Sequence, residues 1–293
     1  MRIHLPLRYP YSFAHTTKRL KSFEKSIYVY REGAFWRTIR GRKGPLLLSV
    51  AEDSERPGLI AEIFGEADPE EEEELKGRIA HMFGTDVDLT PFYEQMRQDP
   101  VLWPVIEQRI GMHLVLDASL YECLVKTIIS QQLNLSFAGT LIERFIQLAG
   151  DTGQFAGETW KVFPAAEQVA CLRYEDLRHL QFNQRKAEYI IDLSRLIAEG
   201  KLDLETLTGL PDDEVMKKLT ALRGIGRWTA ECLLMFGLRR PDLLPAADIG
   251  LRNAVGRLYG LPARPDESEV RRIGEKWAPY RSYATFYLWD TLG

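Results

Sequence analysis

Hydrophobic positions recur with a helical period over most of the chain beyond about residue 89. Leu120, Leu124 and Ile128 are spaced four residues apart and would share one face of a helix. Ser119 and Glu122 form a capping-box sequence at the start of this helix. Further helices are predicted over residues 137–148, 184–197, 212–219 and 229–236, with a shorter one that has Pro164 at its first position.

The first part of the chain follows a different pattern. Residues 27–30 and 34–40 are rich in β-branched and aromatic side chains and flank a turn that contains Gly33, which predicts a hairpin. Residues 46–50 predict a further strand, and residues 69–83 predict a helix that ends at Gly84. We therefore expect an α+β protein, with an N-terminal domain of antiparallel sheet and helices over residues 1–88 and an all-α region over residues 89–293.

Composition narrows the class of protein. The chain has 293 residues, 45% hydrophobic and 27% charged, which suits a soluble globular protein of two or three domains. It contains no apolar run long enough to span a membrane, and residues 1–6 lack the apolar stretch of a signal peptide, so we expect a cytoplasmic protein. Cys123, Cys171 and Cys232 are too few and too far apart for a disulfide framework, a zinc knuckle or an iron–sulfur motif.

The charge distribution is uneven. The net charge of −4 argues weakly against a nucleic-acid binder, but residues 68–74 supply a large part of the negative charge as one acidic block. Basic residues gather in a short C-terminal stretch: Lys217, Lys218, Arg223, Arg227, Arg239, Arg240 and Arg252. On charge alone, this cluster is best interpreted as a solvated helix surface.

The most informative segment is the turn Gly224-Ile225-Gly226 between two predicted helices. The glycines allow a tight turn and a close approach to a ligand, and the amides at the start of the second helix favour an anion. Such a turn would bind a phosphate without reading sequence, while Ile225 would pack between the helices. An ordinary packing corner between two helices is the alternative.

The whole run from Leu222 through Gly224, Gly226 and Thr229 to Ala230 closely resembles the helix-hairpin-helix element of the base-excision DNA glycosylase superfamily. The resemblance implies a hairpin over residues 212–237, and two helical subdomains that hold damaged double-stranded DNA between them. It also implies the DNA-binding residues Gly224, Ile225, Gly226, Arg227 and Thr229.

In that superfamily, a loop after the hairpin carries one essential aspartate. Asp248, in the loop over residues 240–252, matches it: it follows Pro245 and precedes a predicted helix. A carboxylate there would stay ionised beside the helix N-terminus and would stabilise the positive charge that develops on the sugar. Asp248 also suits a helix cap, and both roles are compatible.

Asp242 is the other candidate for the aspartate in this loop, but it lies too far from the start of the predicted helix. Some relatives have an acidic residue just before the aspartate, where this chain has Ala247.

Family members that also cut the strand use a lysine two residues after the second hairpin glycine. This chain has Trp228 there, so the resemblance implies a monofunctional glycosylase that uses water as the nucleophile. The C-terminal segment, which includes Trp289, resembles the closing helix of bacterial DNA-3-methyladenine glycosylase II. The resemblance places Trp228, Trp289 and Cys232 around the pocket for an alkylated purine, although aromatic and cysteine side chains are also common in ordinary cores.

The end of the helix that begins at Ser119 resembles the family segment that fills the hole left by a flipped base. Alignment makes Gln132 the wedge and gives Gln131 the role of positioning the loop. The alternative is that both glutamines cap or solvate the helix end.

The resemblance implies no required cofactor and a monomeric enzyme. It also implies a site for Na⁺ or K⁺ on the main-chain carbonyls of Thr220, Leu222 and Gly224. Two other functions are compatible with the sequence: a bifunctional oxidised-purine glycosylase and AP lyase, which Trp228 disfavours, and a non-catalytic helix-hairpin-helix DNA-binding protein, which Asp248 disfavours.

Overall fold

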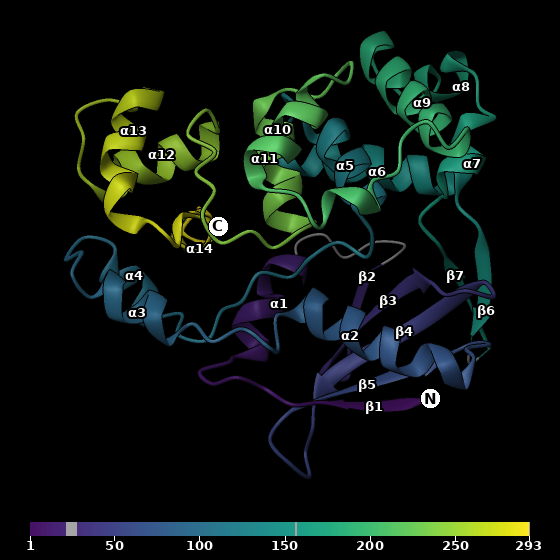
Figure 1. The fold of residues 1–293 in the computed structure, drawn as a ribbon, viewed down its shortest axis with the longest axis horizontal. Coiled ribbons are helices and arrows are strands. Elements are labelled where there is room, and N and C mark those ends of the chain that lie inside the picture. Colours follow the sequence, from purple (N-terminus) through teal and green to yellow (C-terminus); the bar gives the residue numbers. More distant parts are fainter. Residues whose placement is uncertain (22–27, 156, 293) are drawn as a thin grey trace.

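A five-stranded sheet and a larger helical part make up the computed structural model, which describes residues 1–21, 28–155 and 157–292 (Figure 1). The strands are β1 (Arg2–Leu5), β2 (Tyr28–Arg31), β3 (Ala34–Arg40), β4 (Pro45–Glu52) and β5 (Leu59–Phe64). They lie in the order β1-β5-β4-β3-β2, and every neighbouring pair is antiparallel. The predicted α+β class is confirmed.

The hairpin of β2 and β3 follows from its turn. Glu32 and Gly33 both have positive φ angles, 53° and 77°, as a two-residue hairpin turn requires. Strand β3 matches its prediction, β4 contains the predicted segment 46–50, and β2 corresponds to the predicted strand 27–30, of which Ile27 lies outside the described residues. Strands β1 and β5 were not predicted.

Helices cover one face of the sheet and continue beyond it (Figure 1). They are α1 (Phe13–Lys21), α2 (Glu72–Phe83), α3 (Thr90–Met96), α4 (Trp103–Glu107), α5 (Leu120–Ser130), α6 (Leu135–Ala149), α7 (Ala166–Ala170), α8 (Tyr174–Arg178), α9 (Gln184–Ala198), α10 (Asp212–Thr220), α11 (Arg227–Phe236), α12 (Ile249–Leu258), α13 (Glu267–Gly274) and α14 (Arg281–Asp290). Short 3₁₀ turns occupy Pro69–Glu71, Glu205–Leu207 and Glu275–Trp277. Among the described helices, none combines the length and the apolar character needed to cross a membrane.

Several local predictions need correction. Pro164 is not the first residue of a helix, because α7 begins at Ala166 after the N-cap Ala165. The region from residue 89 onward is not purely helical, because it contains the hairpin of β6 (Thr152–Phe155) and β7 (Glu158–Lys161). Phe155 and Trp160 of this hairpin pack on Leu47 of β4, so tertiary contacts stabilise a short and largely polar segment.

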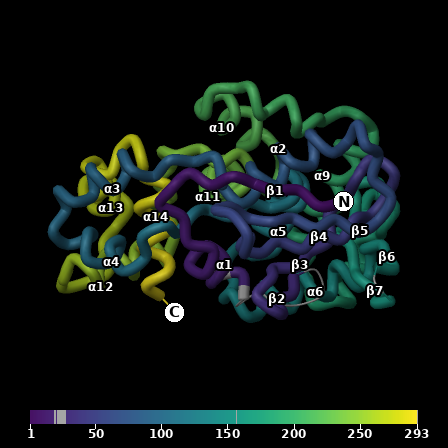
Figure 2. The backbone as a smooth tube through the Cα atoms, turned by 90° about the horizontal axis from the view of Figure 1, so that it is seen from below, coloured from purple at the N-terminus to yellow at the C-terminus, as the bar shows by residue number. Residues whose placement is uncertain are grey.

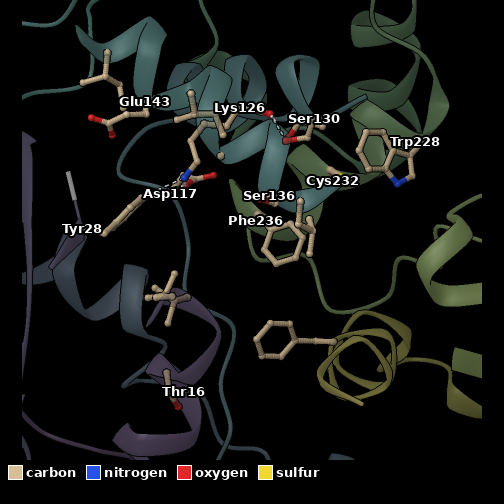
Figure 3. A pocket seen from close by; sticks show the side chains of 18 residues that line it. Thr16, Tyr28, Asp117, Lys126, Ser130, Ser136, Glu143, Trp228, Cys232 and Phe236 are labelled. Carbon is tan, nitrogen blue, oxygen red and sulfur yellow. Dashed lines mark hydrogen bonds and ion pairs between the residues drawn. The ribbon is translucent and has the colours of Figure 1, made fainter. Parts of the chain in front are cut away.

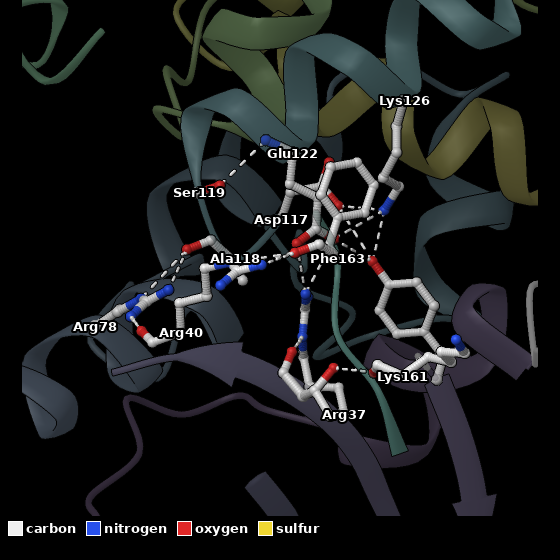
Figure 4. A network of polar contacts seen from close by, with 12 residues as sticks. Arg37, Arg40, Arg78, Asp117, Ala118, Ser119, Glu122, Lys126, Lys161 and Phe163 are labelled. Atoms are coloured by element: carbon white, nitrogen blue, oxygen red, sulfur yellow. Dashed lines mark hydrogen bonds and ion pairs between the residues drawn. The ribbon is translucent and has the colours of Figure 1, made fainter. Parts of the chain in front are cut away.

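The capping box at the start of α5 is only half formed. Ser119 accepts a hydrogen bond from the amide of Glu122, as predicted, but the Glu122 carboxylate turns away towards the sheet. It forms a buried ion pair with Arg37 of β3 at 2.8 Å and accepts the hydroxyl of Tyr28 at 2.9 Å (Figure 4). Lys126, one turn further along α5, joins the same network. This network joins the sheet to α5.

Two large hydrophobic cores run through the described residues, in addition to the small cluster of Leu47, Phe155 and Trp160. The first combines the inner face of the sheet with α2, α5, α6 and α9–α11, and the second combines α3 and α4 with α12–α14. Both tube and ribbon views show α3, α4 and α12–α14 gathered at one end of the molecule (Figure 2). The division at residues 88 and 89 stays a prediction, because the sheet shares its core with later helices. Phe236, at the end of α11, packs against both cores and marks their junction.

Candidate active site

Asp248 lies at the junction of the two cores, as the N-cap of α12. Its Oδ2 accepts hydrogen bonds from the Leu251 amide at 2.6 Å and from the Trp289 indole Nε1 at 2.9 Å. Its Oδ1 accepts the indole Nε1–H of Trp228 at 3.1 Å. Three N–H donors therefore hold the half-buried carboxylate in one orientation and stabilise its negative charge.

Asp248 and its competitor Asp242 differ in their electrostatic surroundings. Among the described residues, Asp248 takes part in no ion pair, whereas its competitor Asp242 is bound by Arg281 at 2.6 and 2.7 Å. Asp242 is therefore engaged in a structural ion pair, and Asp248 is the loop carboxylate that keeps an uncompensated charge.

The two tryptophans were predicted as walls of a base pocket, and the structure adds a polar role for both. Trp228 comes from α11 and Trp289 from α14, so their indole N–H groups approach Asp248 from the two cores. Trp228 also lines a neighbouring cavity. Trp289 stacks on Phe236 with ring centroids 5.9 Å apart and is not among the residues that line the cavity.

A cavity of about 420 Å³ opens beside this cluster (Figure 3). Trp228, Cys232 and Phe236 line it from successive turns of α11, and Phe286 of α14 faces them. The Cys232 side chain is 5% exposed and forms part of the apolar wall of the cavity. This position is compatible with both interpretations from the sequence, a pocket residue and ordinary core packing. No motif in the sequence singled out Phe236 or Phe286 as a pocket residue, and Phe286 also belongs to the second core.

The far end of the cavity is polar. Tyr28, Asp117 and Lys126 lie there, next to the buried network that joins the sheet to α5 (Figures 3 and 4). Burial lowers the pKa of Lys126, but Asp117, Tyr28 and Glu122 outweigh burial and raise that pKa above its ordinary value. Lys126 is the one lysine among the described residues that line the cavity, and it keeps its proton. It therefore lacks the free amine that a Schiff-base nucleophile needs.

The hairpin has the predicted form, with Ile225 buried at 4% exposure in the first core. Gly224 has a φ of +87°, and a Cβ there would lie 2.2 Å from the Tyr189 ring, so only glycine fits. A Cβ at Gly226, by contrast, would meet open space. Helix α11 begins directly after Gly226 without a side-chain cap, which leaves the first amides of a ten-residue helix available to an anion.

The side chains of the predicted DNA-binding residues lie in different places. Arg227 is 66% exposed in its side chain and forms an ion pair with Glu231 at 2.9 Å. Thr229 is 1% exposed, and its hydroxyl accepts a hydrogen bond from Gln131, so its side chain is not available to DNA. The physical reason is the helical period, which turns Thr229 inward two residues after Arg227.

The side chains of Gln131 and Gln132 lie in different surroundings, one hydrogen-bonded within the protein and the other exposed. The Gln131 side chain connects α5 to the hairpin through hydrogen bonds to the Gly224 carbonyl at 3.0 Å and to Thr229 at 2.9 Å. Gln132 is exposed and has a φ of +55°, in the left-handed region that side-chain-bearing residues rarely occupy. This placement suits the positioning and wedge roles respectively, and both roles stay predictions.

The basic cluster is mostly paired within the protein. Arg223 binds Glu188 and Asp192, Arg239 binds Asp86, and Arg240 binds Asp212. Lys217 and Lys218, in the last turn of α10, are exposed and form no ion pair among the described residues. These two lysines are the cations most available to a phosphate beside the hairpin.

The predicted cation site consists of main-chain carbonyls. The Gly224 carbonyl accepts Gln131, and the Leu222 carbonyl accepts the Ile225 amide at 3.2 Å. A carbonyl oxygen has two lone pairs, so these oxygens and that of Thr220 keep the capacity to bind Na⁺ or K⁺. The cation stays a prediction. Side-chain clusters of three or more His, Cys, Asp or Glu that could hold a metal are absent from the described part of the chain.

The family model for the HhH-GPD superfamily base excision DNA repair protein matches residues 125–280, which include the hairpin, Asp248 and the part of the cavity wall that α11 forms. The chain belongs to the HhH-GPD superfamily. Its relative YfjP of Bacillus subtilis is 50% identical over 64% of this chain, a region that covers 64% of the relative's own length.

Two solved DNA glycosylase structures are similar to this chain. The 3-methyladenine DNA-glycosylase from Archaeoglobus fulgidus superposes with a TM-score of 0.86 at 26% identity, over 99% of this chain and 97% of that one. The Schizosaccharomyces pombe 3-methyladenine DNA glycosylase, solved in complex with abasic DNA, gives a TM-score of 0.60 at 28% identity, over 69% of this chain and 96% of that one.

Proposed function

We propose that this protein is a monofunctional DNA glycosylase that flips an alkylated purine out of duplex DNA and hydrolyses its N-glycosidic bond. The observation that carries the proposal is the Asp248 carboxylate, held by two indole N–H groups beside an aromatic-walled cavity. The DNA-3-methyladenine names of structural relatives support alkylated purines as the substrate class.

Binding begins at the hairpin. The first amides of α11 and the open face of Gly226 receive a backbone phosphate without reading sequence. Gln132, exposed at the end of α5, fills the hole in the base stack. The flipped base enters the cavity against Trp228, Phe236 and Phe286. Purines alkylated on a ring nitrogen carry positive charge, so electron-rich aromatic faces attract them.

Bond cleavage depends on Asp248. As the C1′–N bond breaks, its electron pair leaves with the base and positive charge develops on the sugar. The fixed carboxylate stabilises that charge without reorganising, because its three donors hold it in place before the reaction. Water adds its oxygen to C1′ and loses a proton to bulk solvent, while the alkylated base leaves as a neutral molecule, so the products are an abasic sugar and a free base. Trp228 occupies the position of the lysine that strand-cutting members use, and the raised pKa of Lys126, the one lysine among the described residues that line the cavity, keeps its amine protonated.

A release assay distinguishes this function from its alternatives. The protein is incubated with duplex DNA that carries 7-methylguanine, and free base and strand breaks are measured before and after alkali. We expect free base, with strand breaks only after alkali. Strand breaks without alkali would indicate a lyase, and no free base would indicate a DNA-binding protein without catalysis.

A further inference from the structure

A buried lysine holds the end of α5 that carries the Gln131–Gln132 turn. The Nζ of Lys186, a residue of α9, donates hydrogen bonds to the carbonyls of Ile129 and Gln131, each at 2.7 Å. The last carbonyls of a helix lack partners within the helix, and a cation near them is favourable. The Lys186 ammonium group therefore caps the C-terminus of α5.

This lysine lies in surroundings that disfavour its charge. It is 6% exposed, and burial lowers its pKa to about 8. It is the third residue of α9, where the helix dipole disfavours a cation. Within the described part of the chain, no carboxylate forms an ion pair with it. Its hydrogen bonds to the two turn carbonyls are the interactions that offset this cost.

The turn that Lys186 holds is connected directly to the hairpin. The main-chain carbonyl of Gln131 accepts a hydrogen bond from Lys186. The side-chain amide of Gln131 donates hydrogen bonds to the Gly224 carbonyl in the hairpin turn and to the Thr229 hydroxyl in the helix that follows it. Gln132, the next residue, has a left-handed backbone, which persists only where neighbouring contacts hold it. Lys186, Gln131 and Gly224 thus form one continuous chain of hydrogen bonds from α9 to the proposed phosphate-binding turn.

We propose that Lys186 is a positioning residue for base flipping: it fixes the Gln131 carbonyl so that Gln132 projects at a set position relative to the hairpin. This inference rests on the proposed glycosylase function. Binding of a phosphate at the hairpin then places Gln132 against the base stack. Lys186 itself touches neither the base nor the reacting sugar, so its effect depends on whether the lesion must be unstacked and unpaired.

The test compares two duplexes that carry the same 7-methylguanine, one opposite cytosine and one opposite an abasic site. In the second duplex the lesion has no pairing partner, so extrusion needs less help from a wedge. Single-turnover base release is measured for the unaltered protein, for Lys186→Met and for Lys201→Met. Lys201 follows the same helix, is 65% exposed in its side chain and lies near the opposite end from Lys186, which makes it the matched control.

We expect Lys186→Met to lower the release rate about 10- to 100-fold on the paired lesion, the range for losing hydrogen bonds to a charged group. The loss on the unpaired lesion is expected to be about threefold or less, and Lys201→Met should match the unaltered protein on both. Equal losses on the two duplexes, or no loss on either, would overturn the inference.

Two further measurements keep the result interpretable. Thermal unfolding shows whether Lys186→Met is folded; if it is not, Gln131→Met, which leaves the lysine in place, is judged by the same difference between duplexes. Absence of base release by the unaltered protein from both duplexes would overturn the proposed function and this inference together. Release by the unaltered protein with no difference for the variant overturns this inference alone.

Discussion

The indole Nε1 of Trp228 lies 3.1 Å from Oδ1 of Asp248 and donates a hydrogen bond to it. This contact connects the helix that follows the hairpin to the loop that carries the proposed catalytic carboxylate. Trp289 makes the equivalent contact to Oδ2 from the C-terminal helix. The residue that replaces the lysine of strand-cutting relatives is thus a wall of the cavity and also a support for Asp248.

Trp228→Phe should keep the aromatic wall but remove the N–H donor. Because Asp248 would then lose one of three contacts that orient it, we expect base release to slow about 10-fold or more, the effect of losing a hydrogen bond to a charged group. Single-turnover release measures the effect, with Trp103→Phe in α4 as the control. An unchanged rate, with Asp248 still required, would show that the indole N–H is dispensable.

Substitutions at the two hairpin glycines should have different effects, one on the stability of the fold and the other on DNA binding. Gly224→Ala forces a side chain into a left-handed backbone against Tyr189, so we expect the free energy of unfolding to fall by about 2–4 kcal/mol. Gly226→Ala meets no atom of the protein, so unfolding should change by less than about 0.5 kcal/mol while affinity for duplex DNA falls. Denaturant titration and DNA-binding measurements compare the pair. Equal DNA affinity for Gly226→Ala and the unaltered protein would contradict the proposed phosphate site.

Borohydride should trap no covalent adduct between the protein and DNA. The pKa of Lys126 is raised by Asp117, Tyr28 and Glu122 despite burial, so its amine stays protonated across pH 6 to 9, a range well below that pKa. Gel electrophoresis after borohydride treatment detects an adduct, with a known strand-cutting glycosylase as the positive control. A trapped adduct that disappears in Lys126→Met would place this protein in the lyase class.

Glu122→Gln should destabilise the protein in a pH-dependent way. Burial raises the pKa of Glu122, but Arg37 and Lys126 outweigh burial and lower it below its ordinary value. A lowered pKa in the folded state gives stability that is present near neutral pH and is lost as the pH falls through the folded-state pKa. Near pH 7 we expect a loss of about 3–5 kcal/mol, because the variant leaves Arg37 buried without its partner.

Urea denaturation at several pH values tests this expectation. The difference between the unaltered protein and Glu122→Gln should be largest near pH 7 and should narrow in acid. Lys76→Met, which removes an exposed ion pair with Glu73, is the control and should cost about 0–1 kcal/mol. A difference that stays constant with pH would show that the Glu122 charge does not stabilise the fold.

The sequence predicted the elements that local patterns determine and missed those that depend on distant contacts. Strand β3 and helix α9 carry clear periodicity and were found almost to the residue. The β6–β7 hairpin was missed because Phe155 and Trp160 gain their stabilisation from the sheet, which lies far away in the chain. The Ser119 capping box was half wrong for the same reason, since Arg37 is the partner of Glu122.

In the candidate site, too, the sequence predicted the features that local motifs determine and missed those that depend on distant contacts. Asp248 and the hairpin glycines are contiguous motifs, so the sequence was enough to single them out. The direction of the Trp289 indole depends on how α14 packs against the start of α12, which no local pattern encodes. Lys186 carries no motif at all, and its importance appears only when its two carbonyl partners are known.

The most direct test of the account is the single-turnover release of 7-methylguanine by Asp248→Asn. The variant keeps the shape of the side chain and its place at the start of α12 but removes the negative charge. We predict a loss of about 100- to 1000-fold or more in release rate with unchanged affinity for the duplex. Release within about threefold of the unaltered protein would contradict the central role of this carboxylate.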